Sequence, residues 1–324
     1  MFLYINYPSW IHPQIFPGVK FLELLRWYGL MYAVAFATAY FLLKKVWKEG
    51  ALDTPKIKTT EDDLFSFIFT GIIFLLIGAR IFSTLIYDTS GLYRHKPWLI
   101  FWPFDSNGSF TGLQGMSYHG GFVGGFLGMV VWCKFKKRSL LKYCDAMVCA
   151  IPLGYTFGRL GNFLNGELYG RITTMPWGIV FPDAERFSSN LSWVQNFAAK
   201  IGMNITASGL VNLPRHPSQL YEAFFEGIVL WLIIWFVRKH KKFDGMLAAI
   251  YSGGYGIFRF FIEYFREPDA DLGYRIAKDA NAPIYTTTSL LNISTGQILC
   301  ILMMVFAVTY AIISWRISKK QETK

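Results

Sequence analysis

Residues 64–86 read LFSFIFTGIIFLLIGARIFSTLI, and this run of apolar side chains decides the fold. A helix needs about 20 such residues to cross the hydrocarbon core of a bilayer. Outward from it, six more segments have a similar length and character: Phe21–Leu43, Tyr118–Phe135, Ala146–Phe163, Leu220–Val237, Gly245–Ile262 and Gly296–Ile313. A bilayer forces each spanning segment to satisfy its backbone hydrogen bonds internally. The sequence therefore predicts an all-α, polytopic integral membrane protein with seven transmembrane helices.

The composition favours the same class of protein. Of the 324 residues, 53% are hydrophobic and only 16% are charged, whereas a soluble domain carries about a quarter charged residues. The length would permit two soluble domains, but the apolar runs favour a single transmembrane domain over residues 1–324. The formal charge of +11 does not indicate nucleic acid, because the basic residues form short clusters between the apolar runs.

The basic residues also predict the orientation in the membrane. Eighteen of the 32 lie in four short segments that share one side: Lys44, Lys45, Lys48, Lys56, Lys58, Lys134, Lys136, Lys137, Arg138, Lys142, Arg238, Lys239, Lys241, Lys242, Arg316, Lys319, Lys320 and Lys324. By the positive-inside rule that side is cytoplasmic. The N-terminus is then outside, the first span is an uncleaved anchor, and the C-terminus is cytoplasmic. The longer outer loops, at about 87–117, 164–219 and 263–295, are expected to form an extracytoplasmic cap.

The cysteines predict neither a disulfide framework nor a metal site. Cys133, Cys144, Cys149 and Cys300 fall inside spans or at their cytoplasmic ends, and their spacing matches no zinc pattern. They read best as small apolar fillers. Any thiol chemistry at the outer face would therefore use a thiol that the substrate brings.

A polar stretch closes the fourth span, from Gly158 to Arg171 (GRLGNFLNGELYGR). Arg159 and Asn162 are three residues apart and so share a helix face. Arg159 lies roughly 20 Å above the inner end of its span, at about 1.5 Å per residue, close to the lipid phosphates. An arginine that merely snorkels to the interface would explain Arg159. It would not require the amides and the carboxylate beside it.

The fifth and sixth spans carry similar clusters at their outer ends. The sixth ends in Gly253–Asp269 (GGYGIFRFFIEYFREPD), where Arg259 and Glu263 are four residues apart on one face. These two residues could also form an internal ion pair that locks two helices together. Arg215–Glu222 (RHPSQLYE) leads into the fifth span from outside.

His119 opens the third span beside a glycine-rich face. Gly120, Gly124 and Gly128 favour close helix contact. A lone histidine is more often structural than catalytic, but this one lies at the same depth as several arginines. Arginines recognise phosphate through planar, often bidentate hydrogen bonds, and several at the headgroup level indicate an anionic phospholipid. A histidine nearby could remove a proton near neutral pH.

These motifs resemble the prolipoprotein diacylglyceryl transferase family. The segments that carry the resemblance occur in the family's order, spread over most of the spans or their ends: Trp27–Tyr32 (WYGLMY), His119–Gly121 (HGG), Gly158–Arg171, Arg215–Glu222 and Gly253–Asp269. The stretch 158–171 is highly specific, whereas HGG alone would be weak. Arg26 stands where some relatives would have histidine, and residues 172–213 and 270–295 match no motif.

The resemblance implies an enzyme of the bacterial cytoplasmic (inner) membrane, with its active site towards the outer face. It would transfer the diacylglyceryl group of phosphatidylglycerol to the lipobox cysteine thiol of a preprolipoprotein, forming a thioether and releasing glycerol phosphate, without a cofactor or metal. The implied catalytic residues are Tyr28, His119, Arg159 and Arg259. The implied substrate-binding residues are Asn162, Glu167, Gly170 and Tyr255, with Arg80, Glu222, Glu263 and Arg266 in matching segments of less certain role. The outer loops would form a cap that helps admit the protein substrate.

Two other classes would also place arginines at the headgroup level. A transporter or scramblase of anionic phospholipids would line a path with them, but transporters usually show inverted repeats and midplane sites. No repeat is visible here, and the charges lie near one face. A lipid-binding scaffold would not need His119 and would release no glycerol phosphate.

Overall fold

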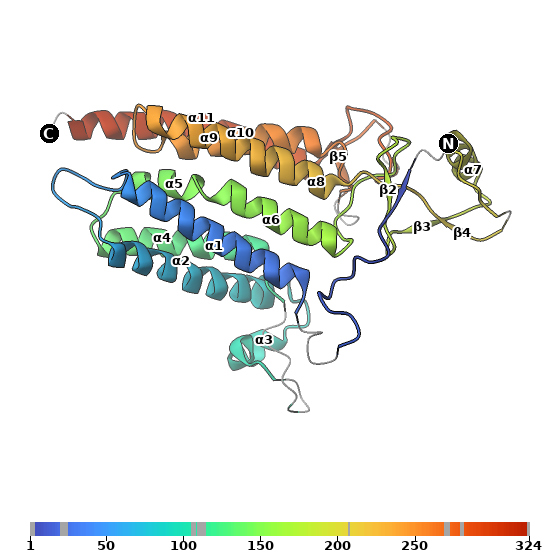
Figure 1. Cartoon of the computed structure of the whole chain (residues 1–324), viewed down its shortest axis with the longest axis horizontal. Coiled ribbons are helices and arrows are strands. Elements are labelled where there is room, and N and C mark those ends of the chain that lie inside the picture. The colour runs from blue at the N-terminus through green and yellow to red at the C-terminus, as the bar shows by residue number, and fades with distance from the viewer. Residues whose placement is uncertain are drawn as a thin grey trace. The chain divides into compact units, whose positions relative to one another are not determined.

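The computed structural model describes residues 4–19, 25–104, 108, 115–206, 208–268, 273–278 and 282–322. Most of these residues are helical (Figure 1). The α-helices are α1 (Trp27–Lys48), α2 (Glu61–Phe82), α3 (Leu92–His95), α4 (Tyr118–Phe135), α5 (Leu140–Val148), α6 (Ile151–Leu164), α7 (Ser192–Lys200), α8 (Ser218–Glu222), α9 (Leu230–Val237), α10 (Met246–Ile262) and α11 (Thr295–Glu322). The segments η1 (Ser83–Tyr87) and η3 (Ala223–Val229) are π-helical, and η2 (Pro97–Phe101) and η4 (Arg238–His240) are 3₁₀-helical.

The helices overlap the predicted spans, but their bounds differ in several places. The first predicted span, Phe21–Leu43, corresponds to α1 from Trp27 on, and its residues 21–24 lie outside the described residues. Among the described residues, four helical stretches are long and apolar enough to cross a membrane: Trp27–Lys48, Glu61–Tyr87, Ser218–His240 and Thr295–Lys320. Helix α10 is a shorter apolar helix, and α4 has the bounds predicted for the third span. The prediction of one helix over Ala146–Phe163 is wrong, because α5 ends at Val148 and α6 begins at Ile151. Pro152 lies in the first turn of α6, where its missing N–H costs no helical hydrogen bond.

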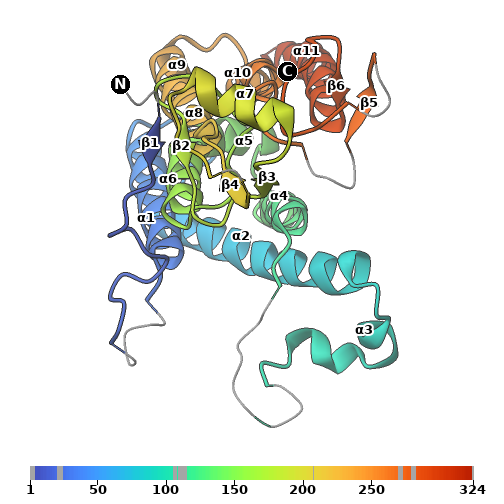
Figure 2. The same cartoon turned by 90° about the vertical axis from the view of Figure 1, so that its right-hand side faces the viewer.

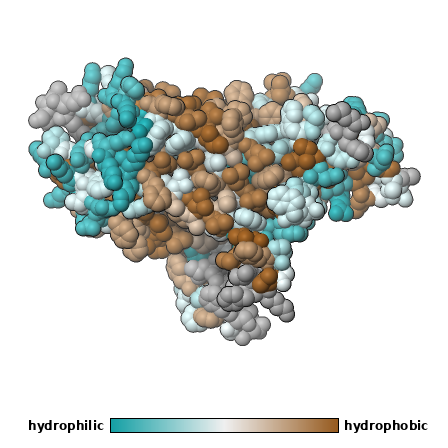
Figure 3. All heavy atoms as spheres, viewed as in Figure 1, coloured by the Kyte–Doolittle hydropathy of each residue, from teal (hydrophilic) through white to brown (hydrophobic). Residues whose placement is uncertain are grey.

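Large apolar side chains remain exposed along the helices. Phe236 in α9 is 71% exposed and Val305 in α11 is 60% exposed. Figure 3 shows apolar residues over the middle of the visible face and hydrophilic residues towards the helix ends. Extended apolar surface of this kind marks contact with lipid or another apolar partner. A membrane protein is therefore what the structure describes, while the number of seven crossings stays a prediction.

The chain divides into two compact units. The small unit is Leu43–Ala146, and the large unit combines Met1–Leu42 with Met147–Lys324. The prediction of one catalytic domain over the whole chain stays a prediction.

The small unit is built on the packing of α2 against α4. Gly78 of α2 meets Gly120 and Gly124 of α4 so closely that a Cβ at any of the three would clash with backbone or ring atoms. This contact confirms the close helix packing predicted from the glycine spacing. At the other end of α2, Thr60 and Asp63 form a capping box, which fixes where the helix begins.

In the large unit, α6 and α10 both pack against the continuous helix α8–η3–α9, and α11 packs against α10. Gly227 in η3 faces Thr156 of α6, and any side chain larger than hydrogen would collide with the threonine hydroxyl. The same hydroxyl donates to the carbonyl oxygen of Ala223 at 3.2 Å. These contacts draw the π-helical segment tightly onto α6.

Short strands follow the helix ends, so the fold is mostly helical and not purely all-α. They are β1 (Ile5–Asn6), β2 (Ile179–Val180), β3 (Arg186–Ser188), β4 (Leu210–Asn212), β5 (Tyr274–Ile276) and β6 (Ile293–Ser294). They pair as β1–β2 in parallel and as β3–β4 and β5–β6 in antiparallel. Figures 1 and 2 show β2, β3, β4 and α7 beyond the ends of α6 and α8. We call residues 166–217, which contain β2, β3, β4 and α7, the loop assembly.

Candidate active site

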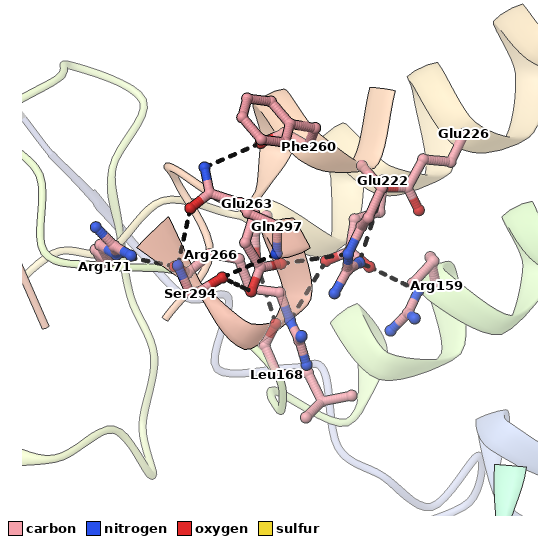
Figure 4. A network of polar contacts seen from close by, with 12 residues as sticks. Arg159, Leu168, Arg171, Glu222, Glu226, Phe260, Glu263, Arg266, Ser294 and Gln297 are labelled. Atoms are coloured by element: carbon pink, nitrogen blue, oxygen red, sulfur yellow. Dashed lines mark hydrogen bonds and ion pairs between the residues drawn. The ribbon is translucent and has the colours of Figure 1, made fainter. Parts of the chain in front are cut away.

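Six charged side chains of the large unit form one buried network, which we call the arginine–glutamate cluster (Figure 4). Its members are Arg159 from α6, Glu222 from α8, Glu226 from η3, Arg259 from α10, and Glu263 and Arg266 just after α10. The Glu222 carboxylate has no exposed surface. Its Oε2 lies 2.9 Å from Arg159 Nε and 2.8 Å from Arg259 Nη1, and its Oε1 lies 4.0 Å from Arg266 Nε. One carboxylate therefore joins three guanidinium groups.

Arg159 has the polar neighbours that its sequence position predicted. Its Nη1 donates to Asn162 Oδ1 at 3.2 Å, and Asn162 Nδ2 donates to Glu167 Oε1 at 2.8 Å. The Arg159 side chain is 16% exposed and is paired with Glu222. The alternative that Arg159 snorkels to the interface is therefore wrong, and its charge is held inside the protein.

Arg259 forms the ion pair that its spacing from Glu263 predicted. Its Nε lies 3.3 Å from Glu263 Oε2, and Ser294 Oγ donates to Glu263 Oε1 at 3.1 Å. Gly296 leaves room for this carboxylate, since a Cβ there would lie 2.6 Å from Glu263 Oε1. The ion pair itself lies at the end of α10, and the hydrogen bond from Ser294 to Glu263 joins this end to the residue before α11. That the pair alone locks two helices, the structural alternative, is therefore not what the contacts show. Arg259 Nη1 also lies 2.8 Å from Glu222 Oε2, so the Arg259–Glu263 pair is part of the cluster.

The turn after α6 is fixed against α8. Gln219 Nε2 donates to the carbonyl oxygen of Glu167 at 2.6 Å, and Ser218 Oγ donates to that of Leu168 at 3.2 Å. Leu168 has a φ of 56°, a left-handed conformation that a leucine rarely adopts. Such strain persists only where the surroundings over-determine the backbone, and it is common at functional sites.

Gly170 lets the turn after α6 meet the chain after α10. Its N–H donates to the carbonyl oxygen of His216 at 2.8 Å, and a Cβ on it would collide with the carbonyl oxygen of Phe265. Arg171 Nε donates to the carbonyl oxygen of Arg266 at 2.9 Å. Two neighbouring residues of the loop assembly therefore set the position of the backbone that carries Arg266.

Two tyrosines of the predicted site border the cluster. The Tyr28 ring lies against Gly161, the residue before Asn162. A Cβ on Gly161 would lie 3.0 Å from Tyr28 Cδ2. Its hydroxyl lies 3.3 Å from that of Tyr32. Tyr255 packs edge to face on Tyr155, with ring centroids 5.9 Å apart. Ten of the twelve predicted site residues thus belong to the large unit, in or beside the cluster.

The other two, His119 and Arg80, belong to the small unit. His119 is exposed in the first turn of α4, and its Nδ1 lies 2.9 Å from the Tyr87 hydroxyl. Arg80 is buried; its Nε donates to the carbonyl oxygen of Ile100 and its Nη1 to that of Gly115 at 3.2 Å. Arg80 thereby holds the chain after α2 in place, and its predicted role in substrate binding stays a prediction. That either residue faces the cluster also stays a prediction.

The sequence analysis did not identify Glu226 of the cluster or Tyr155, whose hydroxyl bonds to the cluster. Tyr155 precedes Arg159 by four residues, and Glu226 follows Glu222 by four, so each shares a helix face with a residue that was identified. That spacing was the available signal. It was weak, because tyrosine is common in apolar helices and Glu226 lies deep within a predicted span.

Besides Arg171, the loop assembly contains the buried arginine Arg215, whose contacts hold the loop together. It pairs with Glu267, and its guanidinium lies over the rings of Tyr169 and Phe187, at 4.9 and 5.8 Å. Its backbone N–H and carbonyl pair with Ile179. These contacts make Arg215 the centre of the loop assembly.

His216 is held in its neutral form. Burial, and next the positive charge of Arg171, lower the pKa of His216 from 6.5 to about 4. Its Nδ1 lies 3.1 Å from the Tyr221 hydroxyl, which accepts a hydrogen bond from Trp177 Nε1 at 2.7 Å. A neutral imidazole suits this aromatic environment, whereas a charged one would be repelled by Arg171.

A helical membrane protein with a buried arginine–carboxylate cluster is the class that the fold and the site define. The sequence model of the family described as prolipoprotein diacylglyceryl transferase matches residues 19–313. The chain is 53% identical over 336 residues to the phosphatidylglycerol–prolipoprotein diacylglyceryl transferase of Treponema denticola, covering 100% of this chain and 98% of that protein. Identity to the enzyme of the same name is 51% over 310 residues in Treponema pallidum (93% and 92% covered) and 40% over 301 residues in Chlorobaculum tepidum (92% and 88% covered). The chain belongs to the prolipoprotein diacylglyceryl transferase family.

The neutral state of His216 predicts how stability depends on pH. Because its pKa is lower in the folded than in the unfolded state, unfolded protein binds more protons between pH 6.5 and about 4. Stability should be complete above pH 6.5 and fall by at most about 3 kcal/mol towards pH 4 from this group alone. We expect His216→Gln to lack this part of the loss, measured as the thermal unfolding midpoint in detergent across the range. The exposed His240→Gln is the matched control and should follow the wild type. Identical curves for wild type and His216→Gln would contradict the assignment.

Proposed function

We propose that the protein transfers the diacylglyceryl group of phosphatidylglycerol to the lipobox cysteine of a preprolipoprotein, the first step of bacterial lipoprotein maturation. Membership of the family supports this reaction, since the relatives carry it in their names. The observation in the structure that carries the proposal is the convergence of Arg159 and Arg259 on Glu222. Two guanidinium groups held side by side suit the two oxygens of a phosphodiester.

The reaction is a direct displacement at carbon. The cysteine sulfur attacks the glyceryl carbon that bears the phosphate ester, a C–S bond forms, and the C–O bond breaks. The electron pair leaves with glycerol phosphate, and the thiol proton passes to a base. A free thiol has a pKa near 8.5, so only a few per cent is thiolate at neutral pH without such a base.

The arginines can hold the phosphate although Glu222 already binds them. A guanidinium has five N–H donors in a planar fork. Glu222, Tyr155 and Asn162 contact Nε and Nη1 of Arg159, and Glu263 and Glu222 contact Nε and Nη1 of Arg259. The Nη2 groups would stabilise the negative charge that grows on the leaving oxygen. Asn162, which is bonded to Arg159, and Tyr28, which packs on Gly161 of α6, would orient hydroxyls of the headgroup.

His119 is the proposed base. If its Nδ1–H donates to the Tyr87 hydroxyl, 2.9 Å away, then Nε2 keeps its lone pair and can accept the thiol proton. Tyr87 would then select the reactive tautomer. The role assumes that the small unit presents His119 to the lipid bound at the cluster.

The topology that fits this reaction has seven spans in the inner membrane, the N-terminus outside and the C-terminus in the cytoplasm. The cluster would then lie at the outer headgroup level, and the loop assembly would form an extracytoplasmic cap over it. A signal peptide that carries the lipobox cysteine would reach the site from the membrane. The basic residues at the opposite helix ends support this orientation.

Cysteine labelling tests the topology. Leu210 in β4 is 68% exposed and Phe135 at the end of α4 is 83% exposed, so both positions are accessible to a reagent. We expect a membrane-impermeant maleimide to label Leu210→Cys in intact spheroplasts and Phe135→Cys only after permeabilisation. The unsubstituted protein, with its four native cysteines, sets the background. The reverse pattern would invert the orientation, and labelling of both in intact spheroplasts would refute the span count.

A transfer assay tests the reaction and the phosphate-binding arginines. Purified protein in detergent is mixed with phosphatidylglycerol and a lipobox peptide with one cysteine, and the peptide mass is followed. We expect a gain of one diacylglyceryl unit, and a loss of about 100-fold or more in rate for Arg159→Ala or Arg259→Ala. Arg159→Lys keeps the charge but not the fork and should also be slow.

The exposed Arg186→Ala of β3 is the matched control and should keep the wild-type rate. An unchanged rate in Arg159→Ala would remove that residue from the site. No mass gain for the wild type, under conditions where the Treponema denticola relative works, would favour transport or binding of anionic lipids instead.

The base is tested by His119→Asn. We expect its rate to fall by about 10²–10⁴-fold, because proton removal from the thiol loses its acceptor. Tyr87→Phe should lose far less than His119→Asn, since it keeps the imidazole and removes only the tautomer preference. The exposed His95→Asn, also in the small unit, serves as the control. Near-normal turnover of His119→Asn would exclude His119 as the base.

A further inference from the structure

Glu226 is a buried carboxylate that the transfer mechanism leaves unused. It follows Glu222 by about one turn, lies in the π-helical segment η3 and has no exposed surface. Its nearest positive partner, Arg259 Nη1, lies 3.8 Å from its Oε1, beyond hydrogen-bond distance. Glu222, by contrast, lies within 2.9 Å of two arginines. The two carboxylates are therefore unequal in how well their charge is compensated.

Tyr155 connects the two carboxylates. Its hydroxyl oxygen lies 2.5 Å from Glu226 Oε2 and 3.1 Å from Glu222 Oε2, and it accepts a hydrogen bond from Arg159 Nε at 2.7 Å. A phenol has one hydrogen and can donate to only one of the two glutamates. If Glu226 is protonated, its O–H donates to Tyr155, and Tyr155 donates to Glu222. Each hydrogen in this series of hydrogen bonds then has an acceptor.

The charge balance of the cluster favours a proton on Glu226 once an anion binds. Among the described residues, the groups that act on Glu226 from the packed helices are Tyr155 and Arg159 of α6, Glu222 of α8 and Arg259 of α10, with Cys300 of α11 nearby. Glu263 and Arg266 join the cluster through Arg259 and Glu222. Helix α9 contributes no ionisable residue. With all six charged residues ionised, the cluster is neutral. A buried phosphodiester would then add an uncompensated negative charge, which is costly at low dielectric.

We propose that Glu226 holds a proton when an anionic headgroup occupies the cluster, and that Tyr155 passes the resulting hydrogen bond on to Glu222. The cluster then carries one net positive charge, which matches a phosphodiester monoanion. Glu226 is in this view a positioning residue that adjusts the charge of the arginine site, and it does not touch the reacting atoms. The inference rests on the proposed function, since it assumes that phosphatidylglycerol binds at the cluster.

The local packing keeps this arrangement in place. Gly227 allows η3 to contact Thr156, one residue after Tyr155, and Thr156 Oγ1 bonds the carbonyl oxygen of Ala223. π-helical turns often occur at functional sites because they redirect one side chain. Here the turn directs Glu226 to Tyr155 on α6.

The proposal predicts a pH dependence of lipid binding that is independent of turnover. Where free enzyme has Glu226 ionised, binding of phosphatidylglycerol takes up one proton, so the Kd rises by up to about tenfold per pH unit. Glu226→Gln carries the neutral form at every pH. Its Kd should be flat and should be lower than that of the wild type at the alkaline end.

The experiment measures equilibrium binding of phosphatidylglycerol to detergent-purified enzyme without peptide, between about pH 6 and pH 9. Infrared difference spectra recorded on lipid addition report the carboxylic-acid C=O stretch. We expect this band to appear in the wild type and to be absent in Glu226→Gln. The exposed Glu185→Gln, in the loop assembly, should keep the slope and band of the wild type.

Each outcome decides the question. A Glu226→Gln variant with the wild-type slope overturns the proposal, as does one that folds but loses binding at every pH, because Glu226 would then act as an anion. If Glu226→Gln fails to fold, Tyr155→Phe keeps the carboxylate and removes the donor that stabilises its ionised form. Its Kd should begin to rise at a higher pH than in the wild type, and an unchanged curve would refute the relay. A wild type that neither binds phosphatidylglycerol nor transfers it would instead refute the proposed function.

Discussion

The Glu222 carboxylate is buried without exposed surface between two guanidinium groups, and the architecture of the large unit depends on it. A buried charge loses several kcal/mol of hydration, so its partners have to be present and well oriented. Arg159 and Arg259 come from α6 and α10, on either side of α8 in the sequence. Three helices must therefore meet at one height for Glu222 to be tolerated.

The loop assembly fixes the ends of these helices relative to one another. Gln219 and Ser218 at the start of α8 bind the backbone of the turn after α6, and Arg171 binds the backbone carbonyl of Arg266. Gly170 permits this contact, because any Cβ would separate the turn from Phe265. Irregular backbone next to the membrane is stable only when its polar groups are satisfied within the protein. These hydrogen bonds meet that need and orient the arginines as well.

The sequence contained enough to predict the helices and part of the cluster. Long apolar runs located the helical segments, and three- and four-residue spacing placed Arg159 with Asn162 and Arg259 with Glu263. It could not show that Glu222 already binds both arginines, because that contact joins residues distant in the chain. Tyr155 and Glu226 were missed because four-residue spacing from Arg159 and Glu222 is a weak signal within apolar helices. The strands of the loop assembly have two or three residues each, too short for any periodic pattern.

The ion pairs within the cluster change what can be inferred about ligand binding from arginines predicted at a membrane surface. Three unpaired guanidinium groups in the outer third of a bilayer would be costly and would attract any anion. Compensated by Glu222 and Glu263, they stay in place without a ligand, and a headgroup bound there as proposed would have to offer more than charge. The donors left to it would have fixed directions, so shape and hydrogen-bond geometry would contribute to selection. Preorganisation of this kind lowers the cost of reorganising the site when charge moves to the leaving oxygen, which is where electrostatic catalysis gains most.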